Sequence, residues 1–430
     1  MSDPTSPVLT PAERMAKRDR LADLLATAAE LEHSVVCQYL FIAFSMKRHP
    51  DEGGVTWAQL EAMRQWQAAI LLIARQEMEH LGLVSNLLTA IGEAPHFLRP
   101  EFPVASAYFP VYDPPSLEAF GVGALQRLVR LERPETVEEA DEELARVHAV
   151  DIHGTTRESV GSLYHEVEDL LIALDGPDLW IGPKSAQRDT AEVIPVPLRG
   201  LTLPPNATIY DVSFTPVYDL PTATTVLQQI IEEGEGGSGT TAPSHFSRLL
   251  AIVAELKQML ASDPLFAPAR PVMKNPTRSA VTDPAALAVF DLFADAYDAV
   301  ILLLMRYFGQ TDESAPEVLG LQQAVFFPMM TAVVRPLGEV LMQLPAGTET
   351  GVRAGPSFAF GRRLAFLPHR EAAWSLIGQH LASMADTAMS VAAAGGFPAP
   401  ITARLQFVAE NLARISLNFA QSMLVPGGES

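Results

Sequence analysis

Hydrophobic residues recur along most of this chain at intervals of three or four, which is the period of an amphipathic helix. In the first half the pattern predicts helices at 21–46, 57–91, 160–174 and 223–233. After a Pro-rich connection at 268–277 it predicts four more, at 284–308, 319–344, 371–394 and 401–424. We therefore expect an all-α fold in which residues 1–265 form a four-helix bundle and residues 266–430 pack on it as a second helical layer.

A long segment between the third and fourth predicted helices, residues 176–221, is rich in Pro and Gly. It contains short β-like pieces at 207–210 and 212–214. A stretch of this length without helical periodicity is typical of a functional loop, so we expect a Pro-rich flap over the bundle and not a separate domain.

The predicted helix at 57–91 carries two titratable residues within its apolar stripe. The stripe is formed by Met63, Trp66, Ile70, Ile73, Glu77, His80, Val84, Leu87 and Ile91. Burying a carboxylate or an imidazole is costly unless it is paired or bound to a metal. Glu77 and His80 also have the Glu-x-x-His spacing with which di-iron and di-manganese bundles chelate metal from one helix face, so we expect both to be metal ligands.

The predicted helix at 21–46 offers a third ligand. Glu32 falls within its buried arc, whereas Glu30 is rotated by about 200° from Glu32 at 100° per residue. Glu32 is therefore the expected ligand from this helix. The alternative is that Glu32 is a surface carboxylate at the rim of the buried face and binds no metal. Carboxylate and imidazole ligands without thiolate suit iron, manganese or zinc.

The remaining two helices of the first half give weaker signals. The helix at 160–174 has no acidic residue at the centre of its buried face, and Glu166 and Glu168 flank Val167 on opposite sides. We favour Glu166 as a ligand, although a helix glutamate more often faces water.

The helix at 223–233 runs into a Gly-rich stretch at 234–239, and His245 begins a new helical pattern beyond it. A helix that unwinds beside acidic residues and resumes at a histidine is the arrangement expected of a split Glu…His ligand set. Glu232 or Glu235 would then act with His245, which we expect to lie near Glu77. The alternative is an acidic, mobile loop followed by a surface histidine.

The composition of the chain disfavours several classes of binding partner and site. The 430 residues include 51 Asp and Glu against 30 Lys and Arg, giving a net charge of −21, which disfavours nucleic acid and anionic membranes. The single cysteine, Cys37, excludes an intrachain disulfide and a multi-cysteine metal site. The N-terminus lacks the apolar core of a signal peptide, and no apolar run approaches the ~20 residues that span a bilayer, so we expect a cytoplasmic protein.

Several motifs together resemble the ferritin-like domain of iminophenyl-pyruvate dimer synthase, an enzyme of violacein and indolocarbazole biosynthesis, and its stand-alone relatives. The matching segments are 30–33 (Glu-Leu-Glu-His), 77–81 (Glu-Met-Glu-His-Leu), 160–164, 231–236, 245–246, 274–277, 335–339 (Arg-Pro-Leu-Gly-Glu) and 354–358 (Ala-Gly-Pro-Ser-Phe). The resemblance covers about residues 20–390 and implies a ferritin-like bundle. The chain departs from the family pattern at Ser162, where the family often has Glu, and at Glu233, where it often has Gln.

The resemblance and the ligand pattern together predict a non-haem oxidative enzyme of specialised metabolite biosynthesis. It would hold two iron ions, or manganese or another divalent metal, and use dioxygen on a small-molecule substrate. Imine coupling, as in the family, is one alternative, and a non-catalytic metal-binding scaffold is another. We expect the second half to wall the substrate pocket with Phe326, Phe327, Met329 and Met330, and the sequence leaves open whether the protein forms a homo-oligomer.

Overall fold

The computed structural model describes most of the chain, namely residues 9–105, 107–109, 113–152, 160–189, 214–234, 243–309, 313–314, 317–318, 320–321, 325–347 and 351–422. Within these residues the regular structure is helical, with a few isolated β-bridges and no strand, so the all-α prediction is confirmed. The α-helices are α1 (Pro11–Ser45), α2 (Trp57–Ala90), α3 (Val122–Leu131), α4 (Glu139–Val147), α5 (Val160–Leu174), α7 (Leu220–Gly234), α8 (His245–Ser262), α9 (Pro284–Phe308), α11 (Arg335–Leu341), α12 (Arg370–Ala393) and α13 (Ala399–Ser422).

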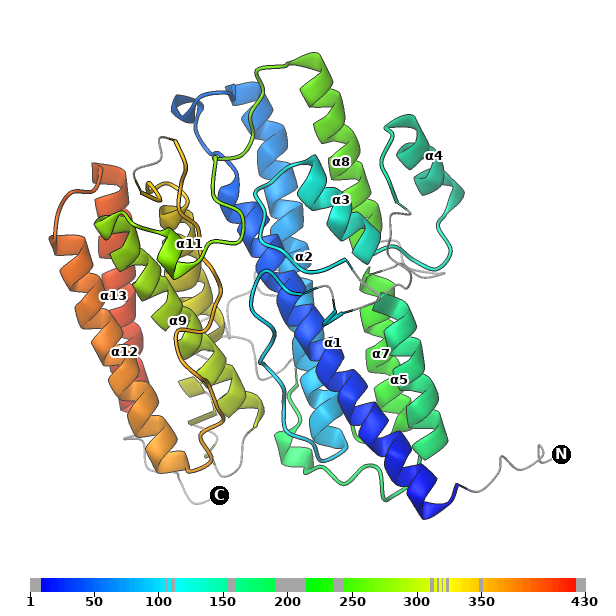
Figure 1. Cartoon of the computed structure of the whole chain (residues 1–430). Coiled ribbons are helices and arrows are strands. Elements are labelled where there is room, and N and C mark those ends of the chain that lie inside the picture. Colours follow the sequence, from blue (N-terminus) through cyan, green and yellow to red (C-terminus); the bar gives the residue numbers. More distant parts are fainter. Residues whose placement is uncertain are drawn as a thin grey trace, which may run out of the picture.

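Two long antiparallel helices, α1 and α2, form the spine of the first half (Figure 1). Helix α1 begins ten residues before its predicted start because Thr10 and Glu13 form a capping box that satisfies free amide groups of the first turn. Thr56 and Gln59 do the same for α2. Both helices are buried along much of their length, which places several polar side chains of each, Glu32, Glu77 and His80 among them, inside the protein.

The other two positions of the bundle are each filled by a pair of shorter helices. Helices α3 and α5 occupy one position, and α7 and α8 occupy the other (Figure 1). Helix α5 packs on α1 and α7, while α8 packs on α2 and α3. The four-helix bundle is therefore present, but two of its four members are interrupted at mid-height, and the pattern analysis did not predict α3 or α4.

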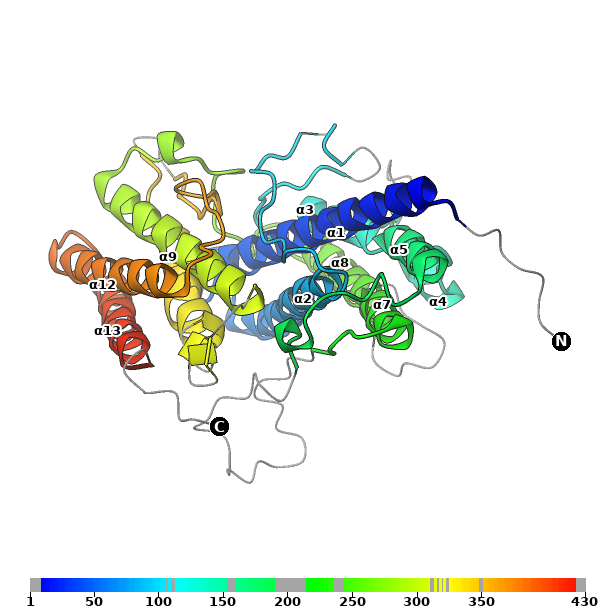
Figure 2. The same ribbon diagram turned by 90° about the horizontal axis from the view of Figure 1, so that it is seen from below.

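The second half forms a separate helical layer beside the bundle (Figure 2). Helices α12 and α13 pair with each other and pack on α9 and on a π-helical stretch, η5 (Val325–Val334). The single helix predicted at 319–344 is thus a π-helix followed by α11, with Pro328 inside the former and Pro336 at the start of the latter. Helix α11 contacts α1 and α9 contacts α2, so the apolar core runs through both halves.

The predicted flap at 176–221 is described only at its two ends, and its β-like piece at 207–210 lies outside the described residues. The first end is fixed to α2, because the Gly182 amide donates to the Ala90 carbonyl at 3.0 Å. The Asn86 side chain also accepts from the Arg188 amide at 3.0 Å. At the second end, Phe214 lies against Gly82 of α2, where a Cβ atom would come within 2.2 Å of its ring.

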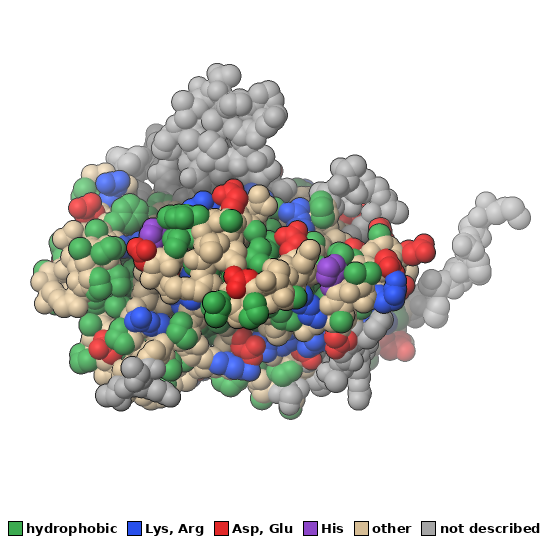
Figure 3. Space-filling view, turned by 90° about the horizontal axis from the view of Figure 1, so that it is seen from above, with side chains coloured by type: hydrophobic (Ala, Val, Ile, Leu, Met, Phe, Trp, Pro, Cys, Tyr) green, Lys and Arg blue, Asp and Glu red, His purple; other side chains and the backbone are tan. Residues whose placement is uncertain are grey.

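On the face seen in Figure 3, acidic and basic side chains are interspersed and form no continuous basic patch. Among the described helices, none combines the length and the apolar character that crossing a bilayer requires.

Candidate metal centre

The core of the candidate centre comes from α1 and α2. Glu32, Glu77 and His80 are each 2–3% exposed, because each occupies a position within the apolar stripe of its helix. His80 Nδ1 lies 3.1 Å from Glu77 Oε2 and 3.7 Å from Glu32 Oε2. The Tyr164 hydroxyl of α5 donates a hydrogen bond to Glu32 Oε1.

A second group meets the first at Glu77, where the interrupted helices break. Glu132 directly follows the last residue of α3, and His245 is the first residue of α8. His245 Nδ1 lies 2.8 Å from Glu77 Oε1 and 3.7 Å from Glu132 Oε2. The Tyr39 hydroxyl donates to Glu132 Oε1 at 2.8 Å. One oxygen of Glu77 therefore faces His80 and the other faces His245.

Glu233, at the end of α7, approaches His80 from the other side. Its Oε2 lies 3.2 Å from His80 Nε2 and accepts from the Gln76 amide at 3.0 Å, and its side chain is 26% exposed. Glu233 is the outermost member of the group.

Burial and the neighbouring charges shift the pKa values of these groups. Burial and the nearby Glu77 raise the pKa of Glu32 to about 7, in spite of His80. Burial opposes the charged form of His245, yet Glu77 and Glu132 raise its pKa to about 9. Burial and Glu132 act to raise the pKa of Glu77, but the two histidines outweigh them and lower it. The cluster is thus an anionic site that gathers positive charge.

The donor set fits divalent metal. Ligand atoms of Glu32, Glu77 and His80 lie within 4.8 Å of one another, and so do those of Glu77, Glu132 and His245. The buried His245 Nε2 makes no hydrogen bond, and the 2.8 Å contact between Glu77 Oε1 and His245 Nδ1 lacks hydrogen-bond geometry. Buried polar atoms without hydrogen-bond partners are costly, and a metal ion bound by nitrogen and oxygen ligands would satisfy them.

The structure brings together four of the seven residues expected from the sequence: Glu32, Glu77, His80 and His245. The prediction that His245 lies near Glu77 is confirmed by their 2.8 Å separation. Glu166 lies outside the cluster, contrary to expectation. It is on the outer face of α5, 48% exposed and paired with Arg20 at 2.9 Å, because its neighbour Val167 points into the bundle.

The split-ligand expectation also needs correction. Glu232 is exposed, Glu235 lies outside the described residues, and their neighbour Glu233 contacts His80 instead. The sequence analysis missed Glu132 altogether. The available signal was its position at the end of a short amphipathic pattern that buries Leu125, Leu128 and Leu131.

Little space remains beside the cluster. A cavity of about 30 Å³ adjoins Glu32, Glu77, His80 and Glu132, and its other walls include Tyr164 and Ile230. Such a volume holds a molecule of the size of water or dioxygen but not an organic substrate.

The sequence is similar to those of two known enzymes. It is 28% identical to dichlorochromopyrrolate synthase of Lentzea aerocolonigenes, over 96% of this chain and 43% of that protein. It is 28% identical to 2-imino-3-(indol-3-yl)propanoate dimerase of Chromobacterium violaceum, over 80% of this chain and 34% of that protein. The chain therefore spans less than half the length of either relative.

A crystal structure of a ferritin-like protein from Caulobacter vibrioides matches 82% of this chain and all of its own, at 21% identity and a TM-score of 0.48. Residues 25–254, more than half of the chain, match the family model described as ferritin-like. This chain belongs to the ferritin-like family.

Proposed function

We propose that this protein is a non-haem, metal-dependent oxidative enzyme that holds two iron ions and acts with dioxygen on a small molecule in specialised metabolite biosynthesis. The observation that carries the proposal is the position of Glu77, whose two carboxylate oxygens face two different histidines. Each histidine has a further carboxylate beside it, which provides a ligand set for each of two ions.

The named residues would divide the work between the two ions. Glu32, Glu77 and His80 would hold one ion, and Glu77, Glu132 and His245 would hold the other. When bound, a pair of ferrous ions supplies the electrons that reduce dioxygen and, once oxidised, an acceptor for electrons from an organic substrate.

The surrounding side chains prepare the site for this chemistry. The hydroxyls of Tyr164 and Tyr39 hold the carboxylates of Glu32 and Glu132 in place, as hydrogen-bonding partners of metal ligands generally do. The small adjoining cavity has room for dioxygen, and Leu31, Val35, Leu131 and Ile230 form the apolar part of its wall.

The relatives support the biosynthetic assignment. Both carry names of small-molecule biosynthetic enzymes, and one is named as a dimerase of an indolyl imino acid. Imine coupling is therefore a second candidate activity for this chain, in which the metal would orient and polarise the substrates.

Oxygen consumption tests the proposal against a non-catalytic scaffold. Purified protein is freed of metal, loaded anaerobically with two equivalents of Fe(II) and mixed with air-saturated buffer in an oxygen electrode. We expect rapid, stoichiometric consumption of dioxygen by the wild type and loss of this phase in Glu77→Gln, with Glu166→Gln as the matched control. A wild-type protein that binds iron yet consumes oxygen no faster than free Fe(II) would favour the scaffold.

A further inference from the structure

Three arginines from separate parts of the chain meet at one buried carboxylate, where the bundle joins the second helical layer. Arg48 lies just beyond α1, Arg335 begins α11, and Arg404 lies on α13. Their nitrogen atoms lie 2.5 Å, 2.9 Å and 2.5 Å, respectively, from the carboxylate oxygens of Glu339, whose side chain is 4% exposed. We call these four residues the arginine cluster.

The carboxylate of Glu339 uses only part of the donor capacity of the arginine cluster. Its Oε1 accepts from Arg48 and Arg335, and its Oε2 accepts from Arg404. In the described part of the chain each guanidinium reaches Glu339 through one nitrogen, although a guanidinium carries five N–H bonds. Because the arginine side chains are 36–41% exposed, a ligand from solvent can reach donors that Glu339 does not use.

A cavity of about 360 Å³ lies beside the arginine cluster. All four cluster residues line it, and the rest of its described lining is Thr331, Pro336 and Phe407. The described wall therefore contains three positive charges and one negative charge. Its net charge is +2, in a protein whose overall charge is −21.

The charged groups behind the cluster do not cancel this excess. Arg270 pairs with Glu52 at 2.6 Å, and Glu52 also accepts from the backbone amide of Arg48 at 2.7 Å. Lys47 lies beside the same pair and adds positive charge. Burial lowers the pKa of Arg48, and the neighbouring arginines lower it further in spite of the carboxylate beside it. Such a shift is expected where positive charge is in excess.

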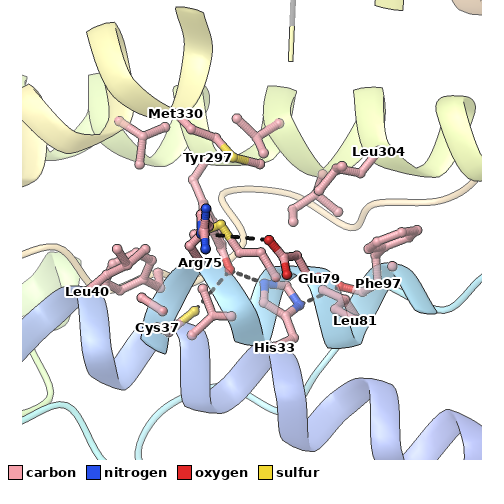
Figure 4. Close-up of a pocket in the computed structure, with 18 of the residues that line it drawn as sticks. His33, Cys37, Leu40, Arg75, Glu79, Leu81, Phe97, Tyr297, Leu304 and Met330 are labelled. Carbon is pink, nitrogen blue, oxygen red and sulfur yellow. Dashed lines mark hydrogen bonds and ion pairs between the residues drawn. The ribbon is translucent and has the colours of Figure 1, made fainter. Parts of the chain in front are cut away.

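The neighbouring cavity, of about 270 Å³, is of a different kind (Figure 4). It shares Thr331 and Arg335 with the first cavity, but apolar side chains form most of its wall. Met330 was among the residues expected to wall a substrate pocket and lines this cavity, while the side chains of Phe326 and Phe327 lie outside the described residues.

The charged and polar side chains around the apolar cavity are engaged within the protein. Glu79 lies 3.7 Å from Arg75 Nε, and the Tyr297 hydroxyl is hydrogen-bonded to His33 Nε2 (Figure 4). Arg99, buried beside Tyr297, adds a positive charge, but its terminal nitrogens donate to two backbone carbonyl groups. The accessible excess of positive charge therefore lies at the arginine cluster and not in the apolar cavity.

We propose that the arginine cluster binds a phosphate group, either as inorganic phosphate or as the terminal group of a small phosphate monoester. A doubly charged phosphate matches the net charge of +2, whereas a singly charged anion would neutralise half of it. Guanidinium groups recognise phosphate oxygens through paired hydrogen bonds. The cavity is larger than a phosphate ion and has room for the organic part of an ester. The site requires no metal ion and is separate from the proposed function.

Four anions of different charge and size test the site: inorganic phosphate, sulfate, glycerol 3-phosphate and acetate. Binding to the full chain is measured by isothermal titration calorimetry at pH 8 and constant ionic strength. Phosphate and sulfate should bind at least about tenfold more tightly than acetate, because they carry two charges. Glycerol 3-phosphate binding more tightly than phosphate would identify an ester as the ligand, and the reverse order would identify free phosphate.

The charge match is tested by repeating the titrations at pH 6. Phosphate takes up a proton between pH 8 and pH 6, so its affinity should fall, whereas sulfate stays doubly charged and its affinity should not change. The described lining of the cavity contains arginines and one glutamate but no histidine, so the site itself should keep its charge over this range.

Substitutions in the cluster should act in opposite directions. Arg404→Gln removes one charge and its donors and should weaken phosphate by about tenfold or more. Glu339→Gln removes the competing carboxylate, so phosphate should bind about threefold or more tightly than to the wild type. Arg278→Gln, which alters an exposed arginine paired with Asp291, is the matched control and should change nothing.

Glu77→Gln should bind phosphate as the wild type does, which separates this site from the metal centre. If Glu339→Gln does not fold, Arg404→Gln and Arg48→Gln still test the site, because Glu339 keeps two arginine partners in each. The proposal is overturned if phosphate binds no more tightly than acetate, if Arg404→Gln leaves the phosphate affinity unchanged, if a folded Glu339→Gln binds phosphate more weakly, or if Glu77→Gln abolishes binding.

Discussion

Replacing Glu77 by Gln should affect both metal ions, whereas Glu32→Gln and Glu132→Gln should each affect one. Among the described residues, Glu77 is the one shared by both ligand groups, while Glu32 belongs to the first and Glu132 to the second. Glutamine has nearly the same size and shape as glutamate but no charge, so the substitution removes a ligand without opening a cavity. The three variants therefore report on how the ions are shared among the carboxylates.

The size of the effect follows from the contacts removed. A hydrogen bond or contact to a charged group contributes about 1.5–3 kcal/mol. The loss of one carboxylate ligand should therefore weaken the binding of the affected ion by about 10–150-fold. Glu77→Gln should weaken both ions by this amount. The metal-free variant should stay folded, because His80 keeps Glu32 and Glu233 nearby and His245 keeps Glu132.

Anaerobic equilibrium dialysis against Fe(II), followed by metal analysis, measures the stoichiometry and both affinities. Dialysed at a metal concentration that just saturates the wild type, Glu32→Gln and Glu132→Gln should each retain about one equivalent, and Glu77→Gln almost none. Glu166→Gln should retain two, because Glu166 pairs with Arg20 on the outer face. The reasoning is wrong if Glu77→Gln keeps both ions at wild-type affinity, or if Glu32→Gln loses both.

Three further substitutions probe a ligand-orienting hydroxyl, a close helix contact and a buried carboxyl group. Tyr39→Phe removes the 2.8 Å hydrogen bond to Glu132 and should lower the affinity of one ion by about 10–100-fold in the same dialysis, and an unchanged affinity would show that the hydroxyl does not orient the ligand. Gly82→Ala places a Cβ atom 2.2 Å from Phe214 and should lower the free energy of unfolding, measured in urea, by about 1–3 kcal/mol. Adding Phe214→Leu should restore part of this loss. If the effects of the two substitutions simply add in the double variant, the clash is refuted. Burial raises the pKa of Asp298 to about 6 from its ordinary 3.8, so the stability associated with its neutral form is present below pH 4 and is lost as the pH rises through 6. The free energy of unfolding of Asp298→Asn relative to wild type should therefore increase by about 1 kcal/mol between pH 5.5 and pH 8, and a difference that does not change with pH would contradict the shift.

The sequence predicted the parts of the fold and site that depend on long regular helices. Glu32, Glu77 and His80 lie on α1 and α2, where an uninterrupted apolar stripe determines which residues face inward. A charged residue within such a stripe is conspicuous, so these three positions could be found from periodicity alone.

The ligands on the interrupted helices could not be predicted in this way. Glu132 follows the last turn of a ten-residue helix, and only the packing of α3 against α8 brings it to His245. Glu233 and Glu232 are adjacent, and a rotation of about 100° between them decides which faces His80. The choice of Glu166 failed for the same reason, since α5 turns Val167 inward and supplies a tyrosine to Glu32 instead of a carboxylate of its own.

A crystal structure of the Fe(II)-loaded protein, with anomalous diffraction measured at the iron edge, would show whether two ions share Glu77. If two ions share Glu77, two anomalous peaks should appear, separated by roughly 3.5–4 Å, the spacing of two-metal sites. One should lie among Glu32, Glu77 and His80, and the other among Glu77, Glu132 and His245. A single peak, peaks that do not contact Glu77, or a fully loaded protein with no peak in the bundle would contradict the sharing of Glu77.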